Sequence, residues 1–307
     1  MNIDQIASAI RGATHGMGTD EKALIQAVSQ LAPQDLPRFD QYYKSQYGKT
    51  AVEVIKSETR GHFSQLLVEA VQPEPVIAAQ SLNAAMKNMG TNEQLLINTL
   101  VGRSNAELMV IKQAYQALYK QDLEAAIKSE VGGDFERFFV VLLQASRDER
   151  GENLNVDADV EAFYRAGAGK IGTDETEFIR LICNRHYDHL ARVMVAYAQK
   201  YGHTLAKDIK KEFSGHIEKV LVAMCDFIEN RPAYFAKLLE ATMSGIGTNE
   251  EQLNRLVLRL RATPLMPAVK GAFLQLYGKS LDERIKGETS GDHEKLLLAL
   301  VNQGIRA

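Results

Sequence analysis

Apolar residues recur along this chain at the three- and four-residue spacing of an amphipathic helix. Ile3, Ile6 and Ile10 share one helical face near the N-terminus, and Leu24 and Val28 repeat the spacing after a short break that contains glycines. The same period continues to the C-terminus, and no stretch alternates convincingly between apolar and polar residues. The pattern predicts an all-α fold.

One sequence pattern occurs four times. Each copy has a Tyr, an Ile-Lys pair eight residues later, a Glu after eleven and a Gly after fourteen, in the stretches 47–61, 119–133, 201–215 and 277–291. A second shared block lies upstream of each stretch: GMGTDE at 16–21, NMGTNE at 88–93, KIGTDE at 170–175 and GIGTNE at 245–250. Identities held at such spacing four times indicate an internal repeat.

The repeats divide the chain into four similar parts of about 70 residues. We place them at 2–71, 74–145, 158–228 and 232–303, with the polar segment 146–157 as a connector. Each repeat has room for about five helices. The threonine of each upstream block is expected to cap the N-terminus of the next helix; these are Thr19, Thr91, Thr173 and Thr248. A glycine that follows the repeat Tyr is expected to end the preceding helix; these are Gly48, Gly202 and Gly278.

Composition limits the possible partners and compartments. The chain has 307 residues, with 36 Lys and Arg against 39 Asp and Glu, and no basic block, so neither nucleic acid nor an anionic surface is expected to be held by charge alone. No apolar run is long enough for a transmembrane helix, and the N-terminus has no signal-peptide core. The two cysteines favour a reducing cytoplasm.

The glycine block and the repeat glutamate together offer the ligands of a hard cation. A Gly-x-Gly loop exposes several main-chain carbonyls, and calcium binds six to eight oxygens that usually include a carboxylate. Glu58, Glu130 and Glu212 each follow the loop threonine by 39 residues, and Glu288 follows by 40. With one carboxylate each, these sites should bind Ca²⁺ weakly and leave room for a lipid phosphate oxygen.

An apolar residue stands between the loop glycines in every repeat: Met17, Met89, Ile171 and Ile246. Such a residue either folds back onto its own repeat or inserts shallowly between lipid headgroups. Both interpretations remain open at this point.

The four G-x-G-T-[DN]-E blocks, each with its I-K-x-E-x-x-G segment, resemble the annexins over essentially the whole chain. The resemblance implies a slightly curved disc of four repeats, whose convex face binds calcium and docks on acidic phospholipids. It also implies a cytoplasmic protein that is peripheral at membranes when calcium rises, and a monomer in solution that can self-assemble on membranes.

The resemblance also implies a set of ligands in each repeat. Three loop residues would provide main-chain carbonyls, and the distant glutamate would provide its carboxylate. The sets are Thr14, Gly16, Gly18 and Glu58 in the first repeat; Met86, Asn88, Gly90 and Glu130 in the second; Ala168, Lys170, Gly172 and Glu212 in the third; and Met243, Gly245, Gly247 and Glu288 in the fourth. The first and fourth sets keep both glycines. The second has Asn, which tolerates a left-handed backbone, and the third puts Lys at the same place.

Further features follow from the same comparison. Annexins have a secondary site built on the loop Glu, here Glu21, Glu93, Glu175 and Glu250, although an acidic first helical turn explains these residues equally well. His15 lies in the first loop, where protonation would add positive charge facing an acidic membrane.

Other classes of function have less support. Cys183, His186 and His189 are spaced on one helix end, but a buried thiol with two surface imidazoles explains them better than a metal site, and no nucleophile–base pair is visible, so we do not expect an enzyme. A cytoskeletal or membrane-scaffolding protein that binds filaments with the same repeat is the alternative. An ion pore ranks lowest, because nothing would satisfy backbone groups in lipid.

Overall fold

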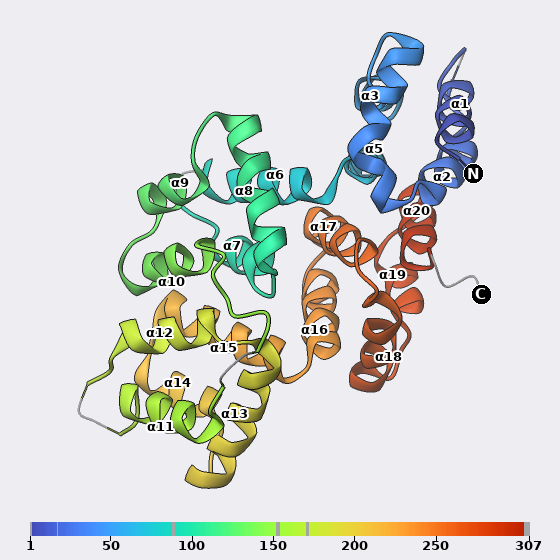
Figure 1. Ribbon diagram of the computed structural model, residues 1–307. Coiled ribbons are helices and arrows are strands. Elements are labelled where there is room, and N and C mark those ends of the chain that lie inside the picture. The colour runs from blue at the N-terminus through green and yellow to red at the C-terminus, as the bar shows by residue number, and fades with distance from the viewer. Residues whose placement is uncertain (1, 17, 88–89, 152–153, 170–171, 304–307) are drawn as a thin grey trace. The chain divides into compact units, whose positions relative to one another are not determined.

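The computed structural model describes residues 2–16, 18–87, 90–151, 154–169 and 172–303. Within these ranges it contains helices α1 to α20, a 3₁₀-helix η1 (Pro33–Asp35), and no strand (Figure 1). The predicted all-α fold with about five helices in each repeat is confirmed. Of the helices in these ranges, none combines the length and hydropathy needed to cross a membrane.

The first and second repeats contribute the first ten helices. Those of the first repeat are α1 (Ile3–Ala13), α2 (Glu21–Gln30), α3 (Leu36–Tyr47), α4 (Ala51–Glu58) and α5 (Gly61–Ala70). Those of the second are α6 (Glu74–Lys87), α7 (Glu93–Leu100), α8 (Asn105–Tyr119), α9 (Leu123–Glu130) and α10 (Gly133–Leu143).

The third and fourth repeats contribute the rest. Those of the third are α11 (Val156–Ala166), α12 (Glu175–Asn184), α13 (Tyr187–Tyr201), α14 (Leu205–Glu212) and α15 (Gly215–Glu229). Those of the fourth are α16 (Arg231–Met243), α17 (Glu250–Arg261), α18 (Met266–Tyr277), α19 (Leu281–Glu288) and α20 (Gly291–Val301).

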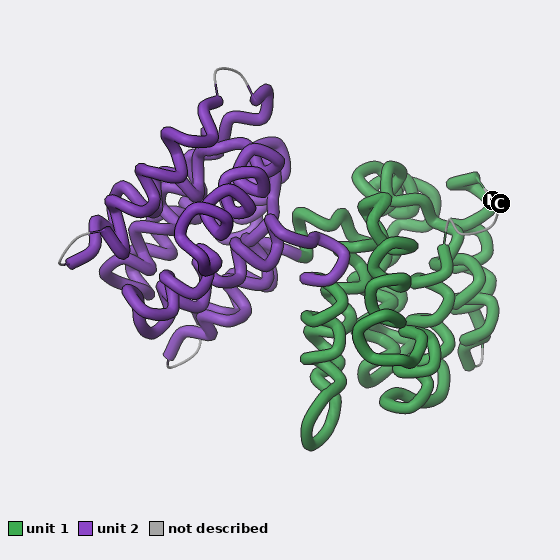
Figure 2. Tube along the Cα trace, turned by 90° about the horizontal axis from the view of Figure 1, so that it is seen from below, with its two compact units in different colours: residues 1–77, 235–307 green, residues 78–234 purple. Residues whose placement is uncertain are grey.

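The repeats pair within two compact units. Unit 1 comprises residues 1–77 and 235–307, and unit 2 comprises residues 78–234 (Figure 2). In unit 1, α2 packs on α20, and α5 packs on both α17 and α20, so helices from the two ends of the chain lie together (Figure 1). In unit 2, α10 packs on α12 and α15. Each unit therefore joins two repeats through their second and fifth helices.

The amphipathic pattern of the sequence corresponds to the core. Ile6, Ile10, Leu24 and Val28 are all buried between α1, α2 and their neighbours. Gly48 ends α3 in the left-handed conformation with φ +79°, as do Gly202 after α13 and Gly278 after α18. The predicted glycine caps are confirmed, because glycine adopts this conformation without a Cβ clash.

Arg261, at the end of α17, joins two other helix ends in unit 1. Its guanidinium donates to the carbonyls of Val28 and Leu31 at the end of α2, and to that of Ala70 at the end of α5 (2.9 Å). Helix C-terminal carbonyls carry partial negative charge, which compensates this partly buried cation. Burial nevertheless lowers the pKa of Arg261 to about 10.

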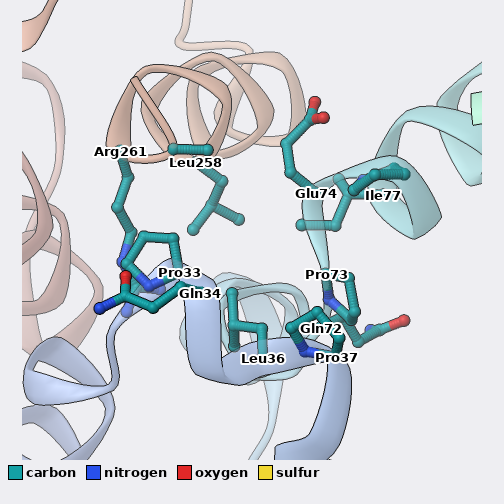
Figure 3. A pocket seen from close by; sticks show the side chains of 12 residues that line it. Pro33, Gln34, Leu36, Pro37, Gln72, Pro73, Glu74, Ile77, Leu258 and Arg261 are labelled. Atoms are coloured by element: carbon teal, nitrogen blue, oxygen red, sulfur yellow. The ribbon is translucent and has the colours of Figure 1, made fainter. Parts of the chain in front are cut away.

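Beside Arg261 lies a cavity of about 370 Å³ (Figure 3). Its walls are mostly apolar, and several come from the prolines that start or precede helices; the lining residues include Pro33, Leu36, Pro37, Pro73, Ile77 and Leu258. The arginine lies at one side of this hollow, next to Pro33 and Gln34 in Figure 3. The cavity therefore separates the proline-containing turns from α17.

Candidate functional site

The glycine loops follow the first helix of each repeat, and their second glycine is left-handed in all four. The φ angles are +88° at Gly18, +89° at Gly90, +81° at Gly172 and +84° at Gly247. Gly16 and Gly245, the first glycines of the first and fourth loops, also have positive φ, +124° and +100°. These positions require a residue without a Cβ. Met17, Asn88, Met89, Lys170 and Ile171 lie outside the described residues.

A main-chain hydrogen bond closes each loop. The N–H of Asp20 donates to the carbonyl of Ala13 (2.9 Å), and the N–H groups of Asn92 and Asn249 donate across the same seven residues. In the third repeat the N–H of Asp174 donates to Ala166 (2.6 Å), which spans eight residues. The third loop is therefore one residue longer than the others.

The longer third loop changes which carbonyl corresponds to that of Thr14. Thr14 caps the C-terminus of α1, and Gly167 caps that of α11. Counted from the helix end, Gly167 is the counterpart of Thr14, whereas counting back from the glycines gives Ala168. Sequence spacing alone missed Gly167. The sequence signal for Gly167 is the extra residue between the last apolar position of α11 and the block KIGTDE at 170–175.

The loops of the first, second and fourth repeats are each hydrogen-bonded to the distant part of their own repeat. The hydroxyl of Thr19 donates to the main-chain carbonyl of Glu58 (3.1 Å), that of Thr91 to Glu130 (3.2 Å) and that of Thr248 to Glu288 (3.2 Å). The expectation that these threonines cap the next helix is wrong. The following residue is the cap: the Asp20 side chain accepts from Ala23 N–H, and Asn92, Asp174 and Asn249 act likewise. The threonine is thereby free to join the two segments.

The four carboxylates have different surroundings. Glu58 and Glu130 are exposed, whereas the side chains of Glu212 and Glu288 are 18% and 27% exposed. Glu58 accepts a hydrogen bond from the hydroxyl of Ser57 (3.2 Å), and Lys211 lies 3.6 Å from Glu212. Glu288 is hydrogen-bonded on both oxygens, to Arg284 and to Thr248 (3.2 Å).

The carboxylates of the first and fourth repeats open onto one polar hollow of about 460 Å³ within unit 1. Its lining consists of pairs from equivalent positions of the two repeats: Glu21 and Glu250, Glu58 and Glu288, Thr59 and Thr289, Arg60 and Ser290, His62 and Asp292, Phe63 and His293. The hollow therefore lies between two matching halves, and both candidate carboxylates reach it.

The loop glutamates of the second and fourth repeats, Glu93 and Glu250, have histidine neighbours. His62 lies 3.9 Å from Glu250 in unit 1, and His216 lies 3.4 Å from Glu93 in unit 2. His62 and His216 occupy the same place, the second residue of the fifth helix. Both contacts join two different repeats of one unit, an arrangement that spacing along the chain does not reveal.

The apolar loop residue that the structure describes points outward. Ile246 is fully exposed, at 110% of the reference area, between the left-handed Gly245 and Gly247. It does not fold back onto its own repeat. A single exposed aliphatic side chain is common on protein surfaces, so this exposure excludes the folded-back arrangement for Ile246 and assigns it no contact.

The cysteine–histidine group does not assemble. Cys183 is buried, and burial raises the pKa of its thiol to about 12. His186 accepts a hydrogen bond from the N–H of Asp188. The expectation of a surface imidazole is wrong for His189, which is fully buried with Nε2 2.7 Å from Asp159 of α11. A buried acidic partner explains its position.

The donor chemistry of the loops fits calcium. Each loop places glycine carbonyls without side-chain obstruction, and three threonine hydrogen bonds hold the segment with the carboxylate against the loop. All members of the first and fourth ligand sets lie within the described residues.

Comparisons with known proteins agree with these features. The Annexin family model matches residues 5–70, 77–142, 158–224 and 234–300. Human Annexin A7 is 36% identical over 307 residues, which cover 98% of this chain and 62% of that protein. The structure of Annexin III superimposes with a TM-score of 0.93 at 34% identity, covering 98% of this chain and 94% of that one. A calcium-bound annexin (Sm)1 superimposes at 0.88 and 30%, covering 98% and 90%. The chain belongs to the annexin family.

Proposed function

We propose that this protein binds calcium through its four glycine loops and docks on acidic phospholipid membranes. The observation that carries the proposal is the hydrogen bond from the loop threonine to the carbonyl of the distant glutamate, made by Thr19, Thr91 and Thr248. In these three repeats the bond supports the assignment, because it joins the loop to the segment that carries the glutamate. The candidate ligands are the four sets given above, with Gly167 as an alternative to Ala168.

The chain itself explains why calcium is needed. Its formal net charge is −3, and the hollow between the first and fourth repeats is lined by five carboxylates. Such a surface repels anionic lipid. Bound calcium supplies positive charge and accepts a lipid phosphate oxygen at coordination positions that the protein leaves open.

The protein contributes position and apolar contact. The left-handed glycines keep the loop main chain accessible, and Ile246 is exposed where a headgroup layer would meet the fourth loop. We place this activity in the cytoplasm, at the membrane surface. The two cysteines support a reducing compartment, because both are free and buried.

The test is calcium-dependent pelleting with phosphatidylserine liposomes. The double variant Glu58→Gln with Glu288→Gln should raise the calcium concentration at half-maximal pelleting about tenfold or more, since a neutral amide is a poor calcium ligand. The matched control is Asp4→Asn with Asp157→Asn. These are exposed acids at the first turns of α1 and α11, at the helix ends remote from the loops.

The control should leave the midpoint unchanged. Equal midpoints for the wild type and the Glu58/Glu288 variant would contradict the assignment of these carboxylates. Pelleting that a chelator fails to reverse would contradict calcium dependence as a whole.

A further inference from the structure

The fourth repeat carries a cation among its own candidate calcium ligands. Arg284 of α19 lies one turn before Glu288, and its Nη1 donates to Oε1 of that carboxylate. Its Nη2 donates to the main-chain carbonyl of Met243. Glu288 and Met243 are two of the four ligands assigned to this site, so one guanidinium contacts both.

The remaining carboxylate oxygen is also engaged. Oε2 of Glu288 accepts a hydrogen bond from the hydroxyl of Thr248 at 3.2 Å. A calcium ion binds a carboxylate through one oxygen or through both. Here one of them already accepts a charge-assisted hydrogen bond, which is stronger than a neutral one.

Arg284 has a second carboxylate that can hold it. Its Nε donates to Oε2 of Glu240 at 2.9 Å and its Nη2 to Oε1 at 3.1 Å, so the pair is bidentate. Glu240 belongs to α16, one turn before Met243. The side chains of Arg284 and Glu240 are 21% and 20% exposed, so water screens this pair only partly.

The other three repeats have no cation at this place. The residue four before the distant glutamate is Val54, Ala126 and Asp208 in the first three repeats. In the first repeat, Val54 is buried and the carboxylate of Glu58 contacts Ser57. A cation four residues before the glutamate is therefore specific to the fourth repeat, whereas in the third repeat Lys211, the residue next to Glu212, lies 3.6 Å from its carboxylate.

We propose that Arg284 is an internal competitor for the fourth calcium site: it holds Glu288 and the Met243 carbonyl when calcium is absent, and calcium binds only as Arg284 withdraws onto Glu240. The proposal rests on the proposed function, because it presumes that Glu288 and Met243 are ligands. It makes the fourth site weaker than the first, although both keep their two loop glycines.

The two cations cannot share the ligands without cost. A guanidinium bonded to a carboxylate oxygen lies within a few ångströms of an ion on the same oxygen, where like charges repel strongly. Retaining Arg284 on Glu240 relieves this repulsion. Glu240 is thus a positioning residue for the arginine, and it touches neither Glu288 nor the loop carbonyls through any hydrogen bond described for this region.

The experiment isolates the fourth site in the full chain. The background carries Glu58→Gln, Glu130→Gln and Glu212→Gln, and calcium binding is measured by calorimetry without lipid. Adding Arg284→Ala, which places there the residue that the second repeat has, should tighten calcium binding about tenfold, as expected for the loss of a partly desolvated charged contact. The calcium-induced rise in melting temperature gives a second readout.

A control and a coupled variant define the outcome. Lys286→Ala removes an exposed cation from the same helix and should leave the affinity unchanged. Glu240→Gln should weaken calcium binding while Arg284 is present and have no effect once Arg284 is alanine, because Glu240 acts by holding the arginine. The two substitutions form a double-mutant cycle that measures this coupling. Arg284→Gln serves if the alanine variant melts early.

Unchanged or weaker calcium binding in both Arg284 variants would overturn the proposal and show that the arginine only orients Glu288. A background protein and Arg284 variants that all fail to bind calcium would instead contradict the ligand assignment of the proposed function.

Discussion

The hydroxyl of Thr19 donates a hydrogen bond to the main-chain carbonyl of Glu58, 39 residues further along the chain, at 3.1 Å. Thr91 and Thr248 make the same bond in the second and fourth repeats. In the first two of these repeats the bond uses the glutamate main chain and so holds the loop near the carboxylate without engaging a carboxylate oxygen. In the fourth repeat the hydroxyl of Thr248 also contacts Oε2 of Glu288 at 3.2 Å.

Thr19→Val should loosen the first site, because valine keeps the shape but has no hydroxyl to donate. We expect the loss of one hydrogen bond, about 1 kcal/mol, to weaken calcium binding at this site about fivefold. Thr19→Ser keeps the donor and is the control. Calorimetry on a chain in which only Glu58 remains as a distant carboxylate measures the effect; identical affinities for the valine and serine variants would contradict it.

Gly18→Ala should strain the first loop through its backbone alone. Gly18 has φ +88°, and a Cβ added there meets no atom within 4 Å. An alanine in this conformation costs about 1 kcal/mol. We expect a lower melting temperature and weaker calcium binding. Gly12→Ala is the matched control, since Gly12 lies inside α1 with no positive φ and an equally open surrounding; it should be neutral or stabilising. Equal effects of the two variants would exclude backbone strain as the cause.

Ile246→Ser should weaken membrane binding without changing calcium binding in solution. Ile246 is fully exposed at the tip of the fourth loop, and burying part of an isoleucine in the headgroup region would stabilise the bound state by about 1 kcal/mol. Liposome pelleting at fixed calcium measures the first quantity and calorimetry the second. Leu274→Ser, on α18, removes another exposed aliphatic residue and should have no effect. The same loss of pelleting in both variants would mean that Ile246 has no special role.

Glu69→Gln should stabilise the protein at high pH. Glu69 of α5 is buried, its Oε2 has no hydrogen-bond partner among the described residues, and the Nε of Arg255 is 3.8 Å from Oε1. Burial raises the pKa of Glu69 from 4.5 to about 7. The native state thus keeps a proton that the unfolded state has lost between these pH values. The proton bound to Glu69 therefore contributes about 3 kcal/mol to the free energy of unfolding. This contribution is fully present below pH 4.5 and is lost as the pH rises through 7.

Denaturant unfolding at pH 5 and pH 8 tests this sign. Glutamine carries no charge at either pH, so the variant should gain on the wild type by about 2–3 kcal/mol between pH 5 and pH 8. A constant difference between the two proteins at both pH values would show that Glu69 does not titrate with folding.

The sequence by itself determined the repeat, the helical class and the ligand types. Amphipathic spacing at Ile6, Ile10 and Leu24 predicted buried faces, and the glycines of the loops predicted left-handed backbone, because both are local properties of a helix or a turn. The constant separation of loop and glutamate also predicted that they meet, which the threonine hydrogen bonds confirm for three repeats.

Only the tertiary structure decided how repeats combine and what surrounds each carboxylate. The pairing of the first repeat with the fourth brings His62 to Glu250, and Arg284 of α19 is hydrogen-bonded to Glu240 and Met243 of α16. Likewise, His189 is buried on Asp159 although its helix position suggested the surface. Local spacing specifies which face of a helix is apolar, but the partner of a polar side chain is set by which helices pack together, and that choice depends on the whole apolar surface of each unit.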